Sequence, residues 1–390
     1  STKNILDAAS FLISHNKDRL GKKLWSDGEK GELVKLNCYK NGKEEAQGVG
    51  SIIEENIKKK NSLNDIAILV RAIYQTREFE ERFLKIGINY RIIGGIKFYE
   101  RAEVKDSVCY LRIINQKFDD LAFERIVNTP RRGLGEFTIK QLHDFSSKNK
   151  ICLEDSAHKL LQLNQFKPKT RSVIKHLLDL IGKWRSDLKK KKHYDLLKIV
   201  LDESGYSAML KNKKDLENEN RIENLKELLR AMHDYDNLQG FLEHVALATS
   251  IDQEWEDEKV NIMTMHAAKG LEFDTVFLPG WEEGLFPHQK SLEEKGDFAL
   301  EEERRLAYVG ITRAKKNAHI SFATQRVWHG EWMDSLPSRF VNELPEEGVK
   351  KNEEPVKEVS DDFDFNQDKF FDNNEEYRSP GWARLKKKLL

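Results

Sequence analysis

The sequence carries no net charge, because its 66 lysines and arginines balance its 66 aspartates and glutamates. A chain-wide basic excess, the usual electrostatic sign of a nucleic-acid-binding domain, is therefore absent, and any surface for nucleic acid must be local. Only 3 of the 390 residues are cysteines, and they lack the spacing of a metal site. That usage fits a reducing cytosol and argues against a disulfide framework. No apolar run approaches the roughly 18 residues of a membrane span, and no signal peptide is visible.

A phosphate-binding loop is also missing. Such a loop requires glycines and a lysine at fixed spacing, GxxxxGK[ST]. The Gly-Lys pairs at residues 21–22, 42–43 and 182–183 lack both the leading glycine and the Ser or Thr. No strand-like segment ends in the acidic pair that would hold magnesium. The chain also begins at Ser1 without a methionine, so we expect it to be a piece of a longer protein.

The first part of the chain has the pattern of an α/β domain. Apolar residues make up 39% of the chain, which is enough to bury a core and form two or more domains. Strands are expected at residues 33–39, 65–70 and 90–93, and helices at 3–20, 48–60 and 74–86. Gly87 would stop the last helix. The resulting β-α-β unit is typical of a parallel sheet covered by helices.

From about residue 112 to residue 258, helical periodicity dominates and strand-like runs disappear. Helices are expected at residues 137–145, 151–163, 170–188, 196–204, 221–238 and 241–248. We therefore predict a mostly α-helical insertion subdomain inside the α/β domain, whose sheet resumes at Val260. The lysine-rich tracts 189–192 and 211–214 are basic, and each is more often a solvated loop or helix end than a nucleic-acid surface.

One segment of the insertion predicts a phosphate contact. Arg131 and Arg132 precede Gly133 and Gly135, which stand just before an expected amphipathic helix. Glycines at a helix start allow close backbone approach, and free amides there can bind a phosphate. The two arginines add a counter-charge that gives affinity without reading sequence. Taken alone, such a pattern is more often an ordinary turn.

The densest pattern lies between residues 260 and 322. Apolar runs at 260–264, 275–278 and 318–322 are typical of buried parallel strands. The small, polar loop after the first of them stands at the carboxyl end of a strand, where α/β proteins place ligand chemistry. Residues 301–309 predict a helix that breaks at Gly310. An arginine at the following helix-to-strand junction, Arg313, could reach a phosphate in a facing domain.

Taken singly, Arg313 and Glu272 would be ordinary solvated charges. Together, TMHAAKGLEF (264–273) and EEERRLAYVGITRA (301–314) resemble motifs V and VI of superfamily-one DNA helicases of the UvrD/PcrA/Rep type. EEGLFPH (282–288) stands in its expected place between them. ILVRAIYQTREFEE and GGIKFYERAEVKD, earlier in the chain, are similar to the second RecA-like domain of that family.

The resemblance implies a domain plan. Residues 1–111 and 259–345 would form the second RecA-like domain, a parallel-sheet α/β domain of the P-loop NTPase fold. Residues 112–258 would be the inserted 2B-like subdomain. Residues 346–390 are acidic with a basic end, and their composition predicts disorder. In the family, the phosphate loop belongs to a first RecA-like domain. Ser1 would follow directly after that domain's γ-phosphate-contacting arginine.

The resemblance also implies roles for the residues of motifs V and VI. Arg313 would be the catalytic residue that stabilises charge on the γ-phosphate, and Glu272 would contact the ribose, with Gly270 forming the turn beside it. Thr264 and His266 would face a DNA strand, although a structural histidine is an alternative for His266. The segment Arg131–Gly135 resembles the family's RGIG element, which implies that it grips duplex phosphates.

We therefore expect the C-terminal motor half of an ATP-dependent 3′–5′ DNA helicase of the bacterial, cytoplasmic type. The full-length protein would use ATP and Mg²⁺, whereas this chain alone would bind neither and would be inactive. The expected partners are single-stranded DNA, junctions between single- and double-stranded DNA, the N-terminal RecA-like half and repair proteins; no membrane is expected. The alternative is a non-catalytic DNA- or protein-binding module, which the missing phosphate loop keeps open.

Overall fold

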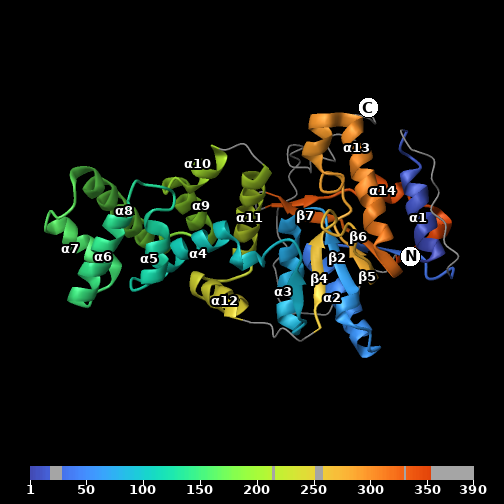
Figure 1. Ribbon diagram of the computed structural model, residues 1–390, viewed down its shortest axis with the longest axis horizontal. Coiled ribbons are helices and arrows are strands. Elements are labelled where there is room, and N and C mark those ends of the chain that lie inside the picture. The colour runs from blue at the N-terminus through green and yellow to red at the C-terminus, as the bar shows by residue number, and fades with distance from the viewer. Residues whose placement is uncertain (18–28, 213–215, 251–257, 329–330, 353–390) are drawn as a thin grey trace. The chain divides into compact units, whose positions relative to one another are not determined.

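The computed structural model describes residues 1–17, 29–212, 216–250, 258–328 and 331–352. These residues form two compact units (Figure 1). The first unit holds the described residues of 1–97 and those after 252, and the second is Phe98–Asp252. The sequence places the corresponding boundaries at 111/112 and 258/259. The helical unit begins earlier because α4 (Ala102–Asn115) packs against other helices of that unit.

A parallel sheet of seven strands, ordered β3-β4-β2-β5-β6-β1-β9, is the framework of the first unit. The strands are β1 (Val34–Tyr39), β2 (Ile66–Val70), β3 (Tyr90–Ile92), β4 (Val260–Thr264), β5 (Phe273–Leu278), β6 (Ala314–Ala323) and β9 (Val349–Asn352). β4 follows the helical unit in sequence and yet lies between β2 and β3. Val70 pairs with Thr264, and Ile92 pairs with Ile262. The predicted parallel-sheet α/β fold is confirmed.

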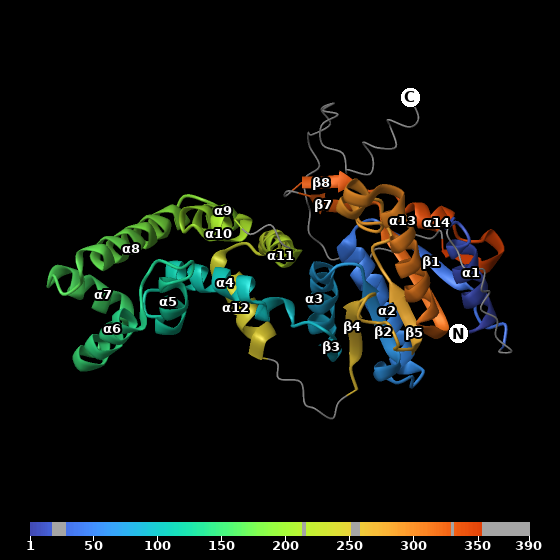
Figure 2. The ribbon, with the colours of Figure 1, turned by 45° about the horizontal axis from the view of Figure 1, so that its top comes forward.

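Helices cover both faces of this sheet (Figures 1 and 2). On one face, α1 (Lys3–Ile13) and α13 (Gln289–Thr312) pack over a core that includes Ala67 and Leu69. On the other, α2 (Gly42–Lys58) and α3 (Thr76–Ile86) pack over Ile66, Ile68 and Val70. Successive residues of a strand point to opposite faces, so the apolar run of β2 serves both cores. The short helices η1 (Leu63–Asp65) and η2 (Ile73–Gln75) flank β2.

Helix α13 does not break at Gly310, so that expectation is wrong. The helix continues to Thr312, and Arg313 is its C-cap. A Cβ at Gly310 would lie 2.9 Å from Leu278 Cδ2 and 3.1 Å from Met265 Sδ. The glycine is therefore needed because the helix lies close against the sheet. Instead, the helix kinks at Gly296, where φ is 54°.

The predicted disordered tail is also wrong for its first residues. Residues 346–348 form the short helix η4, and β9 then adds to the sheet edge, with Val349 paired to Val34. Pairing with β1 orders this segment, because it supplies backbone hydrogen bonds that composition does not reveal. Residues 353–390, including the basic end, lie outside the described part of the chain.

The second unit consists of helices, and its described residues include no strand. These are η3 (Phe98–Glu100), α4, α5 (Asp120–Val127), α6 (Glu136–Asn149), α7 (Leu153–Gln162), α8 (Pro168–Leu188), α9 (His193–Glu203), α10 (Tyr206–Lys211), α11 (Leu216–Met232) and α12 (Leu238–Ser250). Trp184, Phe123 and Phe241 are buried in it. The sequence does not reveal α4, because residues all around that helix are buried and its apolar periodicity is therefore weak.

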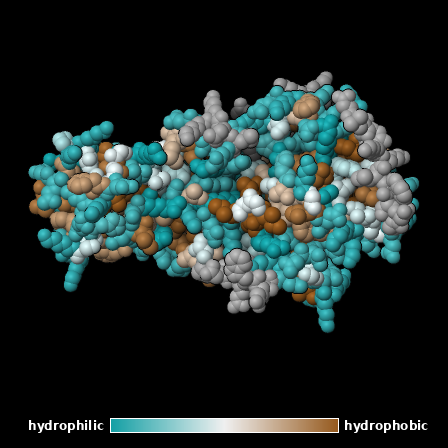
Figure 3. All heavy atoms as spheres, viewed as in Figure 1, coloured by the Kyte–Doolittle hydropathy of each residue, from teal (hydrophilic) through white to brown (hydrophobic). Residues whose placement is uncertain are grey.

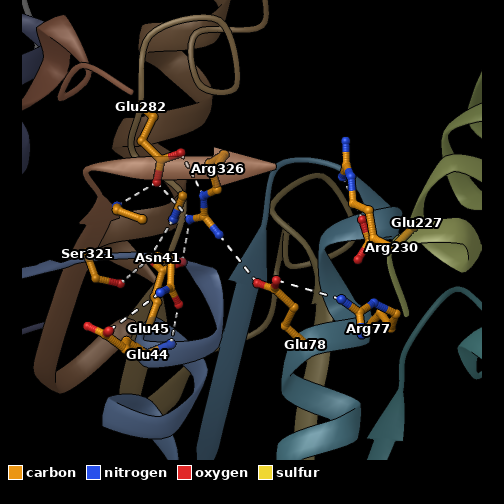
Figure 4. Close-up of polar contacts among 12 residues, drawn as sticks. Asn41, Glu44, Glu45, Arg77, Glu78, Glu227, Arg230, Glu282, Ser321 and Arg326 are labelled. Carbon is orange, nitrogen blue, oxygen red and sulfur yellow. Dashed lines mark hydrogen bonds and ion pairs between the residues drawn. The ribbon is translucent and has the colours of Figure 1, made fainter. Parts of the chain in front are cut away.

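Charged residues buried beside β6 hold the end of the sheet together (Figure 4). Arg326 is the second residue of β7 (Gln325–Trp328), which forms a hairpin with β8 (Glu331–Asp334). Its guanidinium donates to Glu282 at 2.7 and 2.8 Å and to Glu45 at 2.5 Å. Ser321 Oγ also donates to Glu45, at 2.7 Å. Burial opposes charging of Arg326, but Glu282 and Glu45 outweigh it and hold its pKa above its usual range. The network fixes the loop that contains Glu282.

Polar groups predominate on one face of the molecule. Hydrophilic side chains, in teal, cover most of the face shown in Figure 3. Among the described residues, no helix is long and apolar enough to cross a membrane. The short helix α14 (Arg339–Asn342) completes the first unit and buries Phe340 against Trp281 and Phe286.

A buried histidine on β6 predicts a pH-dependent stability. His319 is 5% exposed, stacks on Phe277 with ring centroids 4.8 Å apart, and has no partner for Nδ1 among the described residues. Burial lowers its pKa to about 3. The unfolded chain takes up a proton below about pH 6.5, whereas the folded chain does not, so the free energy of unfolding should fall by about 2 kcal/mol from pH 7 to pH 5.

Urea unfolding of the unaltered chain and of His319→Leu at both pH values measures this contribution. The variant lacks the titrating group, so its loss of stability over the same interval should be smaller by about 2 kcal/mol. An equal loss in both proteins would show that His319 does not titrate in the predicted way.

Candidate functional site

The residues of motifs V and VI lie at opposite ends of the strands. We call the side of the sheet where the strands end the carboxyl edge, and the side where they begin the amino edge. Thr264 is the last residue of β4, so it stands at the carboxyl edge. Phe273 and Ala314 are the first residues of β5 and β6, so Glu272 and Arg313, which precede them, stand at the amino edge. A strand of six residues such as β5 is about 20 Å long. The sequence predicts that the loop after β4 lies at the carboxyl ends of the strands. His266 does lie there, but Glu272 and Arg313 do not.

At the carboxyl edge, Thr264 ends β4 and His266 lies at the start of the loop 265–272. The Thr264 hydroxyl accepts a hydrogen bond from the amide of Ala267 at 3.3 Å, so it helps to shape the turn. His266 is exposed overall. Burial of part of its ring, and then the positive charge of Arg71, lower its pKa, so the imidazole is neutral at pH 7. A neutral imidazole can donate one hydrogen bond without adding charge.

Beside His266, Arg71 forms an ion pair with Glu303 of α13. Nε lies 2.8 Å from Glu303 Oε2, and Nη2 lies 2.6 Å from Oε1. The two side chains are only 16% and 6% exposed. Of the other polar residues after β2, Gln75 accepts from the amide of Ala72 at 2.7 Å and so shapes the turn. Sequence reasoning missed Glu303.

A signal for Glu303 was nevertheless present in the sequence. Residues 303, 306, 307 and 310 recur at helical spacing, and all four are buried. A carboxylate on the apolar face of a helix is rarely buried unless it is paired. Its position on that face therefore predicts a cationic partner on the sheet.

At the amino edge, backbone carbonyls hold the Arg313 guanidinium. Nε donates to Val309 O at 3.1 Å and Nη1 to Leu271 O at 3.0 Å, while Nη2 lies 3.2 Å from Thr312 Oγ1. Among the described residues, no carboxylate pairs with it. The side chain is half-buried, so it is oriented while its charge stays unneutralised.

The neighbours of Arg313 complete this edge. Glu272 is exposed. Gly270 has φ of +88° with open space around its Cα, so its conformation, rather than a close contact, calls for glycine. The hydroxyl of Ser1 donates to Thr312 O at 3.1 Å, which places the first residues of the chain beside Arg313.

In the second unit, the two arginines of the glycine-rich segment have different environments. Arg131 is exposed and has no partner among the described residues. Arg132 turns inward, where Nη1 donates to Ile126 O at 2.7 Å and Nη2 to Tyr110 Oη at 2.7 Å. It therefore satisfies the carboxyl end of α5. The expectation that both arginines face a phosphate is not supported for Arg132.

The glycines of this segment leave open the amino end of α6. Gly133 has φ of +76°, and Gly135 is the N-cap of α6 with no side-chain cap. No atom lies within 4 Å of a Cβ placed at either position. Asn128 shapes the turn by accepting from the amide of Arg132 at 2.8 Å. Gly133, Gly135 and Arg131 thus lie together on an open surface of the second unit.

Comparison with known proteins gives consistent matches. Residues 1–325 match the family model of the UvrD-like helicase C-terminal domain. The chain is 43% identical over 350 residues to a probable DNA helicase II homolog of Rickettsia conorii, covering 89% of this chain and 54% of that protein. It is 41% identical over 362 residues to DNA helicase II of Escherichia coli, covering 90% and 50%.

A third relative is the ATP-dependent DNA helicase PcrA of Staphylococcus epidermidis, which is 35% identical over 358 residues, covering 89% of this chain and 49% of that protein. The chain therefore spans about half the length of the curated relatives it matches.

The different environments of Arg131 and Arg132 predict different effects on stability. Arg132→Ala removes donors from partly buried acceptors, so it should lower the free energy of unfolding by about 1–3 kcal/mol. Arg131→Ala removes only an exposed side chain and should change stability by less than about 0.5 kcal/mol. Urea unfolding of the two variants measures both values. Equal effects would mean that Arg132 does not support α5.

Proposed function

Because the chain belongs to the family of UvrD-like helicase C-terminal domains, we propose that it is the C-terminal motor half of an ATP-dependent DNA helicase. In this function, a nucleotide lies between this domain and a facing RecA-like domain, and the motor moves along single-stranded DNA from 3′ to 5′. The direction of movement rests on the resemblance of motifs V and VI.

The state of Arg313 is the observation that carries this proposal. Its guanidinium is held in place by carbonyl groups and pairs with no carboxylate among the described residues. Arginines often cap the last carbonyls of a helix in this way, but Arg313 does so within a segment that matches motif VI of the family. A guanidinium oriented in advance can stabilise negative charge that develops on a γ-phosphate in a facing domain. An arginine with this role contributes roughly 10³ to 10⁵ in rate.

This chain would contact ATP and Mg²⁺ from one side only, opposite the facing RecA-like domain. The 390 residues contain no GxxxxGK[ST] loop, so most of the nucleotide and metal contacts would come from the N-terminal RecA-like half. This chain would supply Arg313 to the γ-phosphate and Glu272 to the ribose, where a carboxylate can accept hydrogen bonds from hydroxyls. Gly270 would place Glu272 by allowing the left-handed turn.

DNA would contact other parts of the chain. Thr264 and His266 lie at the carboxyl edge, away from Arg313, and their hydroxyl and imidazole can donate to the phosphates of a single strand. In the second unit, Arg131 and the open amino end of α6 offer charge and free amides to duplex phosphates. Arg132 would act indirectly, by holding the segment in shape. The proposed substrate is a junction between single- and double-stranded DNA, and repair proteins are further proposed partners.

A second function is favoured by one observation. The missing phosphate loop would also suit a non-catalytic module that binds DNA or protein. In that case, Arg313 and Glu272 would have no facing nucleotide.

ATP hydrolysis distinguishes the two functions. Hydrolysis with and without oligothymidylate should be measured for this chain alone and after it is combined with an N-terminal RecA-like half. We expect no hydrolysis by the chain alone and DNA-stimulated hydrolysis by the combination. Arg313→Ala should lower that rate roughly 10³-fold or more, because the charge opposite the γ-phosphate is lost.

Arg305→Ala is the matched control, because Arg305 lies on the same helix and, among the described residues, pairs only with Glu301 and Glu302 on the helix surface. It should keep the rate of the unaltered protein. If the two combined halves are folded and yet hydrolyse no ATP, the non-catalytic binding module is favoured. Hydrolysis by the chain alone would contradict the assignment of the nucleotide to the other half.

Duplex binding tests the role of Arg131. Because one phosphate contact is lost, Arg131→Ala should weaken binding of a duplex at low salt and reduce the slope of log K against log[salt] by about 1. Fluorescence anisotropy with a labelled duplex measures both. Lys150→Ala, which alters an exposed lysine at the far end of α6, is the control. Unchanged affinity for Arg131→Ala would refute this contact.

A further inference from the structure

Glu303 is a buried carboxylate that the proposed contacts with ATP and DNA leave unused. Its side chain is 6% exposed. Both of its oxygens are engaged, because Arg71 binds them in a bidentate pair and the amide of His288 donates to Oε2 at 3.1 Å. A carboxylate removed from water in this way has been desolvated at a cost, and the pairing offsets that cost.

The ion pair joins α13 to the edge where DNA is proposed to bind. Arg71 follows Val70 at the end of β2, and His266 follows Met265 after β4. The amide of Met265 donates to Val70 O at 2.9 Å. Arg71 and His266 therefore each follow directly after one of these two hydrogen-bonded residues. A movement of the backbone at His266 therefore acts on Arg71 and on the helix that Glu303 belongs to.

The same helix is attached to the other end of the loop 265–272. The amide of Phe273 donates to Arg313 O at 2.9 Å, and Arg313 Nη1 donates to Leu271 O at 3.0 Å. Between these points, α13 packs closely against Leu278 and Met265, because a Cβ at Gly310 would lie 2.9 Å from Leu278 Cδ2 and 3.1 Å from Met265 Sδ. The helix therefore contacts the start of the loop at Met265 and its end at Leu271, and it reaches His266 indirectly through Arg71.

From this arrangement, and resting on the proposed function, we propose that Glu303 is a positioning residue that couples DNA contact at His266 to the position of Arg313. Residues 303 and 313 are about 15 Å apart along the helix. A hydrogen-bonded helix is stiff over that length, and packed interfaces shift between discrete arrangements rather than deform gradually. Anchored through Glu303, α13 would carry a displacement at one edge of the sheet to the other.

A merely structural role for the ion pair predicts different behaviour. A buried ion pair can often be replaced by apolar side chains of similar volume without loss of stability, whereas removal of one partner leaves an unpaired buried charge. The double variant Arg71→Met/Glu303→Met therefore separates the two roles. It should fold with a stability close to that of the unaltered chain and yet lose the coupling. Glu303→Gln alone should be less stable, because Arg71 stays buried without a carboxylate.

Hydrogen exchange, measured on this chain in the absence of nucleotide, tests whether Glu303 links α13 to the loop 265–272. In the double variant, the amides of Met265 and Phe273 should both exchange faster, by about 2- to 30-fold, whereas amides of β1 should be unchanged. Phe273 is informative because it lies at the amino edge, far from the substituted side chains. Glu302→Gln, which alters an exposed residue of the same helix, should change neither amide.

The functional link is tested in the combination with the N-terminal half. The ratio of ATP hydrolysis with oligothymidylate to hydrolysis without it should fall by about 2- to 30-fold in the double variant and stay unchanged in Glu302→Gln. The proposal is overturned if the double variant keeps this ratio, or if only Met265 exchanges faster while Phe273 is protected as before. If the unaltered combination hydrolyses no ATP, the proposed function fails, and the exchange at Phe273 still decides whether Glu303 holds α13 and the loop together.

Discussion

The first unit depends on the hydrogen bonds that β4 makes to both of its neighbours. This strand is separated from β2 and β3 by the whole helical unit, and yet it lies between them. Asn261, fully buried on β4, reinforces the position: its Nδ2 donates to Ile66 O at 3.0 Å, and its Oδ1 accepts from Arg91 Nε at 2.7 Å. Without β4 the sheet would be divided, and buried backbone groups would lose their partners. The loop after β4 carries motif V, so the candidate site depends on this pairing too.

The parallel sheet separates the two proposed contacts, one to DNA and one to nucleotide, within one short stretch of sequence. Residues 265–272 pass from the carboxyl edge, with His266, to the amino edge, with Glu272. Helix α13 spans the same interval, from Glu303 beside Arg71 to Arg313 beside Leu271. The proposed motor function requires a nucleotide contact and a DNA contact at a distance from each other, joined by elements that move together. The loop 265–272 and α13 are two elements that connect these sites.

Parallel strands could be predicted because strands buried on both faces read as continuous apolar runs, as in β2, β4 and β5. Other features could not be predicted, because they depend on what lies beside them. Helix α4 is buried around most of its surface and so lacks a clear polar face. Gly310 resembles a helix breaker but lies inside α13, where the helix packs closely against Leu278 and Met265. β9 becomes a strand through its partner β1, in a stretch whose composition predicts disorder.

The sequence by itself determined the fold class, the family and the identity of the polar residues at the candidate site, because motif spacing and apolar runs are local properties of the chain. Only the tertiary structure decided which of those residues act together. Parallel pairing put Thr264 and Arg313 at opposite edges, and close packing turned Arg132 inward while leaving Arg131 exposed. It also paired Glu303 with Arg71, 232 residues earlier in the chain. Contacts between residues so far apart in the sequence depend on how the helices and strands pack, and the local sequence pattern does not predict them.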